Sequence, residues 1–434
     1  MSDAAGLVLL LGPVDTTLLA VVGLIALALL FDYTNGFHDS ANAIATVVAT
    51  RVLRPRWAVA WAAAWNFVAF FFVGTAVANT IGSTVNREYF GLAVVFAALL
   101  GALTWNFTSW HLGLPTSSSH ALVGGLVGAG LTAGGLQAIK AESVEKTALF
   151  IVISPIAGLL LGGIVMLVIR AALHRANVER TERRFRLLQL VSSAAVSLAH
   201  GGNDAQKTMG VIAALLVSSG HLAPHPDGSL PIPGWVVIAA YTAIAAGTLS
   251  GGWRIVRTMG QGITHLRPVS GFAAETAAAL AIFSSTSLGA PVSTTHTVAG
   301  AVTGVGTTNT GVTVNWRVFG RLVIAWVVTM PAAAVVAAIT YLLSTRLPRP
   351  IAIPVMTALM LVLVAALILA LRRAPKAADV EPARAEAIPA GLRPGAGSII
   401  DARGIPASRE VLDHGGAVDE AETAAQRGAA HQPW

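Results

Sequence analysis

The stretch LLAVVGLIALALLFDYTNGFHDSANAIAT, residues 18–46, joins two kinds of sequence that rarely occur together. Its first half, residues 18–31, is an uninterrupted apolar run. Its second half places His38, Asp39 and Asn42 where a membrane span would continue. An ionisable group at the bilayer centre costs about 2.5–3.5 kcal/mol even on permissive insertion scales, so such groups face a polar interior and mark function. The stretch therefore predicts a membrane helix that lines a polar site.

The composition of the whole chain supports a membrane location. Hydrophobic residues make up 55% of the sequence and charged residues only 11%, whereas soluble domains carry about 25% charged residues. Many apolar runs are long enough to cross a bilayer, and the strict alternation of a β-barrel is absent. We therefore predict an all-α polytopic membrane protein. It has no cysteine, which excludes disulfides, thiolate metal sites and a cysteine nucleophile.

Glycines beside the polar residues predict interrupted helices. Gly36 lies in the first apolar stretch, and Gly201 and Gly202 lie in a later one, so we expect breaks near residues 32–38 and 200–204. Unwound backbone in a membrane must meet water, an ion or substrate, so a break would mark a cavity. The alternative is a glycine that lets two helices pack closely. The stretches predicted to be helical are 18–50, 57–77, 90–110, 115–131, 147–170, 187–218, 234–250, 270–288, 291–308, 318–343 and 351–371.

The polar motif occurs twice. NGFHDSANAIAT, residues 35–46, aligns with HGGNDAQKTMGV, residues 200–211. The alignment pairs Asp39 with Asp204. It also pairs Asn42 with Lys207.

A second motif repeats in the same order. GLPTSSSHALVGGLVGAG, residues 113–130, aligns with GAPVSTTHTVAGAVTGVG, residues 289–306, which pairs His120 with His296. Two motifs that recur in one order at similar separation indicate an internal duplication rather than chance.

Charge in the loops predicts how the chain crosses the membrane. Short loops rich in Lys and Arg face the cytoplasm, and the net charge of +7 is explained by these loops rather than by nucleic-acid binding. The basic segments are 51–56, 170–186, 253–267 and 372–376. With all four inside, the N-terminus lies outside, and Arg346 and Arg349 fall outside, against the rule. The two halves then run in opposite directions, the inverted-repeat arrangement of secondary transporters.

The predicted organisation has four parts. They are a first inverted repeat in the membrane (1–170), a basic cytoplasmic linker (171–186), a second inverted repeat in the membrane (187–371) and a disordered cytoplasmic tail (372–434), whose composition buries too little apolar surface to fold.

Each copy of the second motif starts with a hydroxyl-rich segment, and a Gly-rich apolar stretch of about half a membrane span follows it. Hydroxyl donors and free N–H groups at the positive end of a helix make an anion site, and neutral donors allow the anion to leave again. The alternative is plain N-capping with hydrogen bonds between helices. The candidate substrate-binding residues are Ser117, Ser118, Ser119, Ser293, Thr294, Thr295 and Lys207.

Carboxylates beside an anion site require a co-transported cation. Carboxylate and amide oxygens suit Na⁺, and carboxylates also accept protons, while histidines titrate near neutral pH. The candidate ion-coupling residues are Asp39, Asn42, Asn203, Asp204, His38, His120, His296 and Glu275. His200 is a weaker candidate, each histidine could instead be structural, and Asp32 could sit at an interface. No metal site is expected unless Asp39 and Asp204 ligate Na⁺.

These four motifs resemble those of the inorganic phosphate transporter (PiT) family of secondary carriers, of the bacterial low-affinity type, over residues 30 to 345. The resemblance implies inverted repeats with broken helices and re-entrant helical hairpins, and phosphate uptake driven by Na⁺ or H⁺. It also implies that the aspartates and asparagines of the first motif serve the ion path and that the hydroxyls serve phosphate.

Two departures from the family pattern affect the coupling ion. His38 and Lys207 stand where the family often has asparagine. A fixed ammonium near Asp204 could replace a cation, so we expect proton symport, with Na⁺ symport as the alternative and a divalent metal–phosphate complex left open. We expect no cofactor and no nucleic-acid partner. A multi-pass carrier in the inner (plasma) membrane is predicted, and a homodimer is left open.

The motifs are also compatible with two other functional classes. An intramembrane hydrolase would pair Ser119 or Thr295 with His120 or His296, but adjacent residues on one helix rarely face each other, and a nucleophile needs its base within about 3 Å. A passive anion channel is disfavoured by acidic groups on the path. We therefore expect a transporter and not an enzyme.

Overall fold

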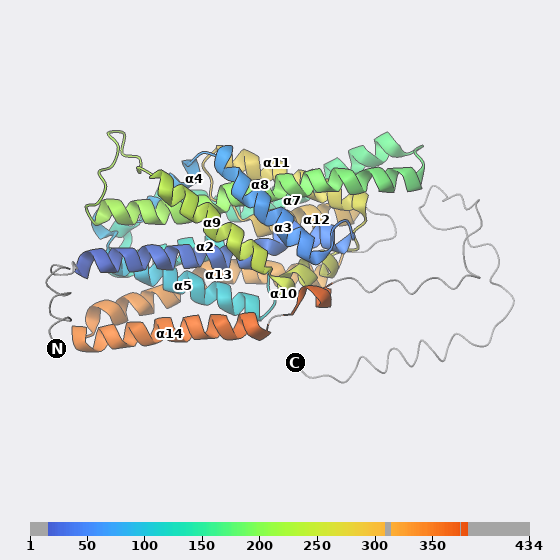
Figure 1. Cartoon of the computed structure of the whole chain (residues 1–434). Coiled ribbons are helices and arrows are strands. Elements are labelled where there is room, and N and C mark those ends of the chain that lie inside the picture. Colours follow the sequence, from blue (N-terminus) through green and yellow to red (C-terminus); the bar gives the residue numbers. More distant parts are fainter. Residues whose placement is uncertain (1–15, 309–313, 374, 381–434) are drawn as a thin grey trace, which may run out of the picture. The chain divides into compact units, whose positions relative to one another are not determined.

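The computed structural model describes residues 16–308, 314–373 and 375–380. Over these residues the chain is helical, with no β-strand (Figure 1). The principal helices are α2 (Thr16–Ala49), α3 (Pro55–Val68), α4 (Ala76–Gly82), α5 (Leu92–His111), α6 (Ser118–Gly134), α7 (Ala141–Leu173), α8 (Val178–Ser218), α9 (Gly234–Ser250), α10 (Trp253–Arg257), α11 (Pro268–Ser287), α12 (Thr294–Thr308), α13 (Trp316–Arg346) and α14 (Arg349–Arg373). The prediction of an all-α polytopic protein is confirmed.

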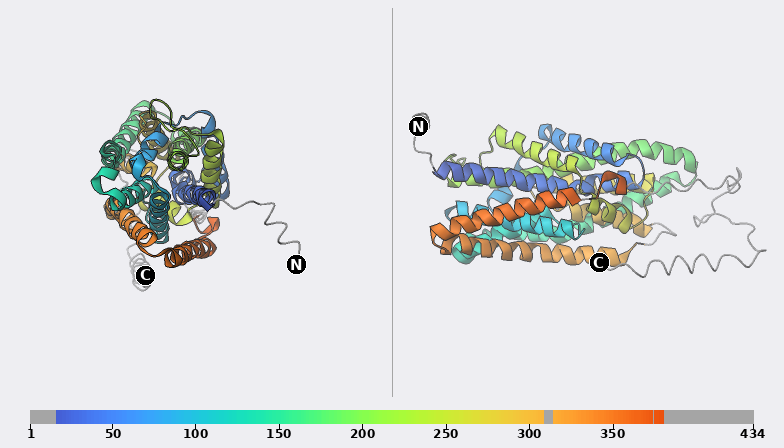
Figure 2. Two further views of the ribbon diagram at one scale, coloured as in Figure 1. Left: turned by 90° about the vertical axis from the view of Figure 1, so that its left-hand side faces the viewer. Right: turned by 60° about the horizontal axis from the view of Figure 1, so that its bottom comes forward.

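Length and apolar composition allow six of the described helices to cross a membrane, or up to eight spans if each of two bent pairs counts as one. The six are α2, α5, α6, α7, α13 and α14. The helices α8, α11 and α12 fall outside this group, and they carry many of the polar residues singled out from the sequence. Figure 2 shows the helices running side by side, with α14 on the outside of the bundle.

The helix α2 does not break near residues 32–38, so that prediction was wrong. It continues from Thr16 to Ala49. Gly36 instead permits close packing, because a Cβ there would lie 2.1 Å from the backbone oxygen of Ile244 on α9. A helix interior tolerates glycine when a neighbouring backbone needs the space.

The predicted break near residues 200–204 is also absent, because α8 is continuous through it. A Cβ at Gly201 would lie 2.6 Å from the backbone oxygen of Asn66, and one at Gly202 would lie 2.6 Å from Val73. Both glycines let α8 approach the first half of the chain. Packing therefore explains these glycines.

Broken spans occur instead in the helices that follow. The axis turns by 91° between the segment Pro55–Phe71 and α4, and by 65° between α9 and the segment Trp253–Gly260. Each bent pair comes directly after α2 or α8, the long helices that carry the two copies of the aspartate motif. The prediction of broken helices is therefore confirmed, at different positions.

The long helices α2 and α8 cross the centre of the molecule in opposite directions. Asn35 on α2 hydrogen-bonds Asp204 on α8, and Thr50, just after α2, hydrogen-bonds Gln189. As the residue number rises along α2, the number of the contacting residue on α8 falls, so the two helices are antiparallel. In Figure 1, α2 starts at the left-hand end and α8 at the right-hand end. The opposite directions of α2 and α8 support the inverted repeat predicted from the aligned motifs.

The two halves are interleaved rather than adjacent. The hairpin of α5 and α6 packs on α13, and the equivalent hairpin of α11 and α12 packs on α7. Likewise α9 packs on α2, while α3 and α4 pack on α8. Each half therefore completes the packing of the other. The predicted helical hairpins are present, and their re-entrant character stays a prediction.

The basic segments gather at one end of the bundle. Arg186 donates to the backbone oxygen of Arg51 at 2.8 Å, and Arg267 lies 2.6 Å from Glu182. The grouping agrees with the loop assignment, while the side of the membrane that this end faces stays a prediction.

The predicted tail lies mostly outside the described residues. Its first part is helical, since α14 continues to Arg373 and a short 3₁₀ turn spans Ala377–Val380. Arg372 and Arg373 suit the negative end of the helix. Residues 381–434 are not described, so the predicted disorder there stays a prediction.

Candidate functional site

The tips of the two hairpins meet in the middle of the bundle. The helix α6 starts at Ser118 and α12 at Thr294. Ser119 Oγ donates to the backbone oxygen of Val292, in the loop before α12, at 3.3 Å. The rings of His120 and His296, one turn into each helix, are 4.8 Å apart between centroids. Two positive helix ends therefore face one small region from opposite halves of the chain.

Two of the predicted hydroxyls cap these helices. Ser117 Oγ accepts from the backbone N–H of His120 at 3.3 Å, and Ser293 Oγ accepts from that of His296 at 3.1 Å. Each cap satisfies one free N–H group of the first turn. Ser117 and Ser293 thus hold the tips in shape.

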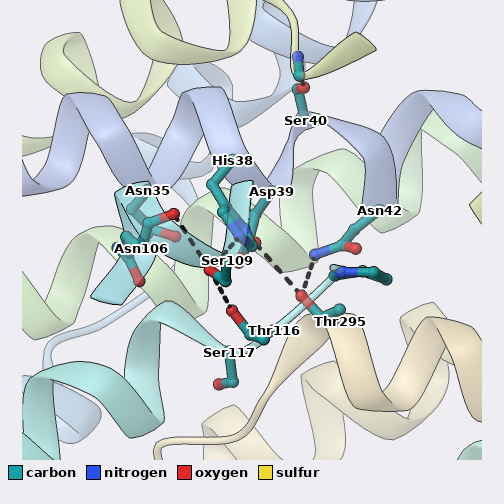
Figure 3. A network of polar contacts seen from close by, with 12 residues as sticks. Asn35, His38, Asp39, Ser40, Asn42, Asn106, Ser109, Thr116, Ser117 and Thr295 are labelled. Carbon is teal, nitrogen blue, oxygen red and sulfur yellow. Dashed lines mark hydrogen bonds and ion pairs between the residues drawn. The ribbon is translucent and has the colours of Figure 1, made fainter. Parts of the chain in front are cut away.

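The first-half motif faces the second-half hairpin (Figure 3). His38 Nδ1 lies 2.7 Å from Asp39 Oδ1, and Thr295 Oγ1 on α12 donates to the same oxygen at 3.3 Å. Asn42 Nδ2 donates to Thr295 at 2.9 Å and to Thr294 at 3.2 Å. The acidic motif and the hydroxyl motif, far apart in sequence, are in direct contact.

The second-half motif faces the first-half hairpin in the same way. Lys207 Nζ donates to Asp204 and to Ser119 Oγ, and it donates to the backbone oxygen of Val292 at 3.2 Å. Asn203 Nδ2 donates to Thr286 Oγ1 at 2.8 Å. The ammonium thus joins a carboxylate to both hairpin tips.

These contacts are equivalent in the aligned repeats. Asn42 aligns with Lys207, and Thr295 aligns with Ser119. The pair Asn42–Thr295 and the pair Lys207–Ser119 therefore occupy corresponding places. The chemical difference is that one half supplies a neutral amide where the other supplies a fixed cation.

Two carboxylates and an imidazole come close enough together to hold a cation. Asp39, His200 and Asp204 each offer a ligand atom, and these atoms lie within 4.8 Å of one another. His200 Nε2 is 3.3 Å from Asp204 Oδ2. All three side chains are at most 3% exposed. Because Lys207 already bonds Asp204, an ion here would compete with the ammonium for the same carboxylate.

Glu275 lies in a separate polar group. Gln189 Nε2 donates to it at 3.0 Å, and the hydroxyls of Ser192 and Thr46 also donate to it. Its side chain is 1% exposed. These contacts do not include Asp39, so the structure puts Glu275 outside the central group of aspartates.

Several site residues were missed from the sequence. Asn35 donates to Asp204 at 3.4 Å, Ser109 lies 3.3 Å from His38, and Asn66 lies 3.3 Å from His200. Asn35 could have been found, because it aligns with His200 at the start of the two motifs. Ser109 and Asn66 come from neighbouring helices and had no motif to mark them.

The geometry gives no support to an intramembrane hydrolase. Ser119 bonds Lys207 and Val292 rather than a histidine. Neither ring nitrogen of His120 has a hydrogen-bond partner among the described residues. His296 stacks on Trp326 with ring centroids 4.1 Å apart. The serine–histidine pair that nucleophilic catalysis needs is therefore not formed by these residues.

The interleaved halves, broken spans and buried polar centre define a multi-pass membrane transporter. Residues 35–337 match the model of the phosphate transporter family, PHO4. The chain belongs to this family, which confirms the resemblance found in the motifs. It is therefore a phosphate transporter and not an enzyme.

Relatives carry the same description. A protein of Rhizobium meliloti (strain 1021), named "Probable low-affinity inorganic phosphate transporter", is 51% identical over 74% of this chain and 95% of its own length. A Bacillus subtilis (strain 168) protein of the same name is 40% identical over 75% of this chain and 98% of its own. A solved structure titled "The sodium-dependent phosphate transporter" has a TM-score of 0.69 and 25% identity, and covers 76% of this chain and all of that one.

Proposed function

We propose that this protein is a secondary active carrier that takes up inorganic phosphate across the cytoplasmic membrane together with protons. The observation that carries the proposal is the meeting of the α6 and α12 tips between Asp39 and Asp204. An anion held at that place would touch neutral donors from both halves, and carboxyl groups buried in the same region would handle the driving ion.

The hairpin tips suit phosphate chemically. Ser118 Oγ is buried and has no hydrogen-bond partner among the described residues, so it can donate to an anion. The hydroxyls of Thr294 and Thr295 lie at the opposite tip, next to Asn42. Helix N-termini bind phosphate through N–H groups and the helix dipole. Hydroxyls and amides hold an oxyanion without the strong pairing that would prevent its release.

The charge pattern favours protons over sodium. Lys207 sits against Asp204 and supplies the positive charge that a bound Na⁺ would otherwise bring. Removing one member of a buried ion pair is strongly unfavourable, so the ammonium is not readily displaced. A carboxylate elsewhere on the path can still take up a proton.

Sodium coupling is the second candidate. The ligand atoms of Asp39, His200 and Asp204 are close enough together for a small cation, and carboxylate oxygens are ligands of hard cations. The structural relative is described as sodium-dependent. A sodium-coupled carrier would need to tolerate Lys207 beside its ion.

Uptake of labelled phosphate into proteoliposomes tests the proposal. The purified full chain is given an inward pH gradient or an inward Na⁺ gradient, one at a time. We expect accumulation driven by the pH gradient and independent of Na⁺. Accumulation driven by Na⁺ alone would favour the second candidate, and a flux that neither gradient can make concentrative would reject secondary active transport.

A further inference from the structure

Among the described residues, Asp32 is a fully buried carboxyl group whose oxygens have no hydrogen-bond partner. It lies on α2 with 0% of its side chain exposed. Neither of its oxygens has a hydrogen-bond partner in the described part of the chain. Glu275, which is equally buried, receives hydrogen bonds from three side chains. Of the side chains that the structure describes, only Thr208 and Asn35 lie close enough to donate to Asp32. A buried ionised carboxylate with so few donors is unfavourable, so Asp32 favours a cation or a proton.

The side chains around Asp32 also have unused polar atoms. Thr208 on α8 and Asn35 on α2 lie next to its carboxyl group, and its charge acts on Tyr241 of α9. Thr208 Oγ1, Asn35 Oδ1 and the Tyr241 hydroxyl lack hydrogen-bond partners among the residues that the structure describes. All of them are at most 1% exposed. Two helices, α2 and α8, therefore bring the Asn35 amide and the unpaired Thr208 hydroxyl to one buried carboxyl.

A proton on Asp32 removes its charge, and the new O–H group can donate to a side chain that is already beside it. A protonated Asp32 has an O–H donor, and the unpaired hydroxyl oxygen of the neighbouring Thr208 can accept from it. The charged groups that act on Asp32 are Asp204 and Lys207, both from α8, besides the titratable Tyr241. Lys207 cannot neutralise Asp32 without leaving Asp204, which it already bonds. A proton is thus the cation that costs least at this position.

Asn35 connects Asp32 to the central site. It is three residues after Asp32 and four before Asp39, so the three side chains share one face of α2. Its Nδ2 donates to Asp204 Oδ2 at 3.4 Å. A change of protonation at Asp32 can therefore reach the central aspartates through one amide.

We propose that Asp32 carries the coupling proton, in an inference that rests on the proton-driven uptake proposed above. The Asp32 carboxylate takes a proton from hydronium on the outer side, which leaves water, and the new carboxyl O–H donates a hydrogen bond to a neighbouring oxygen. It gives the proton to water on the inner side after the carrier has reoriented. Asp39 and Asp204 then shape the phosphate site rather than carry the proton.

Two transport modes distinguish carrying a proton from binding phosphate. In Asp32→Asn the side chain is permanently neutral, so the loaded carrier can cross but the empty carrier cannot release a proton and return. We expect net uptake driven by a pH gradient to be lost, while exchange of labelled for unlabelled phosphate persists. Asp32→Glu, which restores a carboxyl group, should recover net uptake with a shifted pH dependence.

A matched control uses an aspartate outside the membrane. Hydrogen bonds from the backbone and hydroxyl of Ser229 lower the pKa of Asp227, which keeps this exposed carboxyl ionised in the assay. Asp227→Asn removes one negative charge from the chain and should leave both transport modes as in the wild type.

Four results would overturn the inference. Net uptake by Asp32→Asn equal to wild type would show that another group carries the proton. Loss of exchange together with net uptake, in protein shown to be inserted, would place Asp32 in phosphate binding. An unchanged pH dependence in Asp32→Glu would show that the pH dependence of uptake does not come from Asp32. Wild-type protein that ignores the pH gradient would reject the proposed function itself, and this inference with it.

Discussion

Asp204 has an ammonium beside it, and Asp39 has an imidazole and a hydroxyl. Lys207 bonds Asp204, whereas Asp39 lies against His38 and Thr295. The two aspartates align in the duplicated motif. The difference arises because the second copy has Lys207 at the position where the first copy has Asn42. At the scale of single residues, the two halves have the same geometry but different charge. This inequality is the main reason for expecting protons rather than sodium.

Replacement of Lys207 by asparagine tests that reason directly. Lys207→Asn makes the second motif like the first and leaves Asp204 without its cation, so we expect uptake to become stimulated by Na⁺. The measurement is initial uptake against Na⁺ concentration at fixed pH in proteoliposomes. An ion profile identical to that of the wild type would remove the argument for proton coupling based on Lys207.

Neutralisation of either central aspartate should abolish concentrative uptake. Asp39→Asn and Asp204→Asn keep the size of the side chain but remove the charge that the site is built around. Asp204→Asn also leaves Lys207 buried without its partner, which costs about 3–5 kcal/mol in comparable pairs. We therefore expect both variants to lose uptake and Asp204→Asn to unfold at the lower temperature in detergent. Full uptake in either variant would refute a role for that aspartate.

At the scale of helices, most of the fold could be predicted and the breaks could not. Most apolar stretches became helices, because a membrane requires every backbone group to be paired within its own segment. The stretch predicted at 57–77 instead contains a bend of 91°. Gly36 and Gly201 were expected to interrupt helices, yet both lie in continuous ones. A glycine shows that a side chain is excluded, but the sequence does not show whether backbone geometry or a neighbouring helix excludes it. The repeat predicted which motifs belong together, and Asn66 and Ser109 were missed because they lie outside it.

A pair of glycines on α2 tests the packing explanation. Gly36→Ala would place a Cβ 2.1 Å from the Ile244 oxygen, whereas no atom lies within 4 Å of a Cβ at Gly23. Overpacking costs about 1–3 kcal/mol, while alanine in place of an exposed helical glycine gains about 0.5–1 kcal/mol. We expect Gly36→Ala to lower the unfolding temperature in detergent and Gly23→Ala to hold or raise it. Equal effects would mean that α2 and α9 do not pack closely at Gly36.

At the scale of the whole molecule, two inverted halves share one site. Each long motif helix contacts the hairpin of the other half, so neither half could form the site alone. The central side chains are almost fully buried, which makes this structure closed to both sides. Transport then requires the halves to shift relative to each other and open the same residues alternately. The motif alignment predicted the shared centre, while the closed state could be seen only from the packing.

Alternating exposure of Ser118 tests the central claim most directly. The chain has no cysteine, so Ser118→Cys is a single label at a hydroxyl without a hydrogen-bond partner among the described residues. A membrane-impermeant thiol reagent is added to one side of oriented vesicles and then, in a second preparation, to the other. We predict modification from both sides and slower modification in the presence of phosphate. Modification from one side only, at a rate that phosphate does not change, would contradict a shared site that opens to each side in turn.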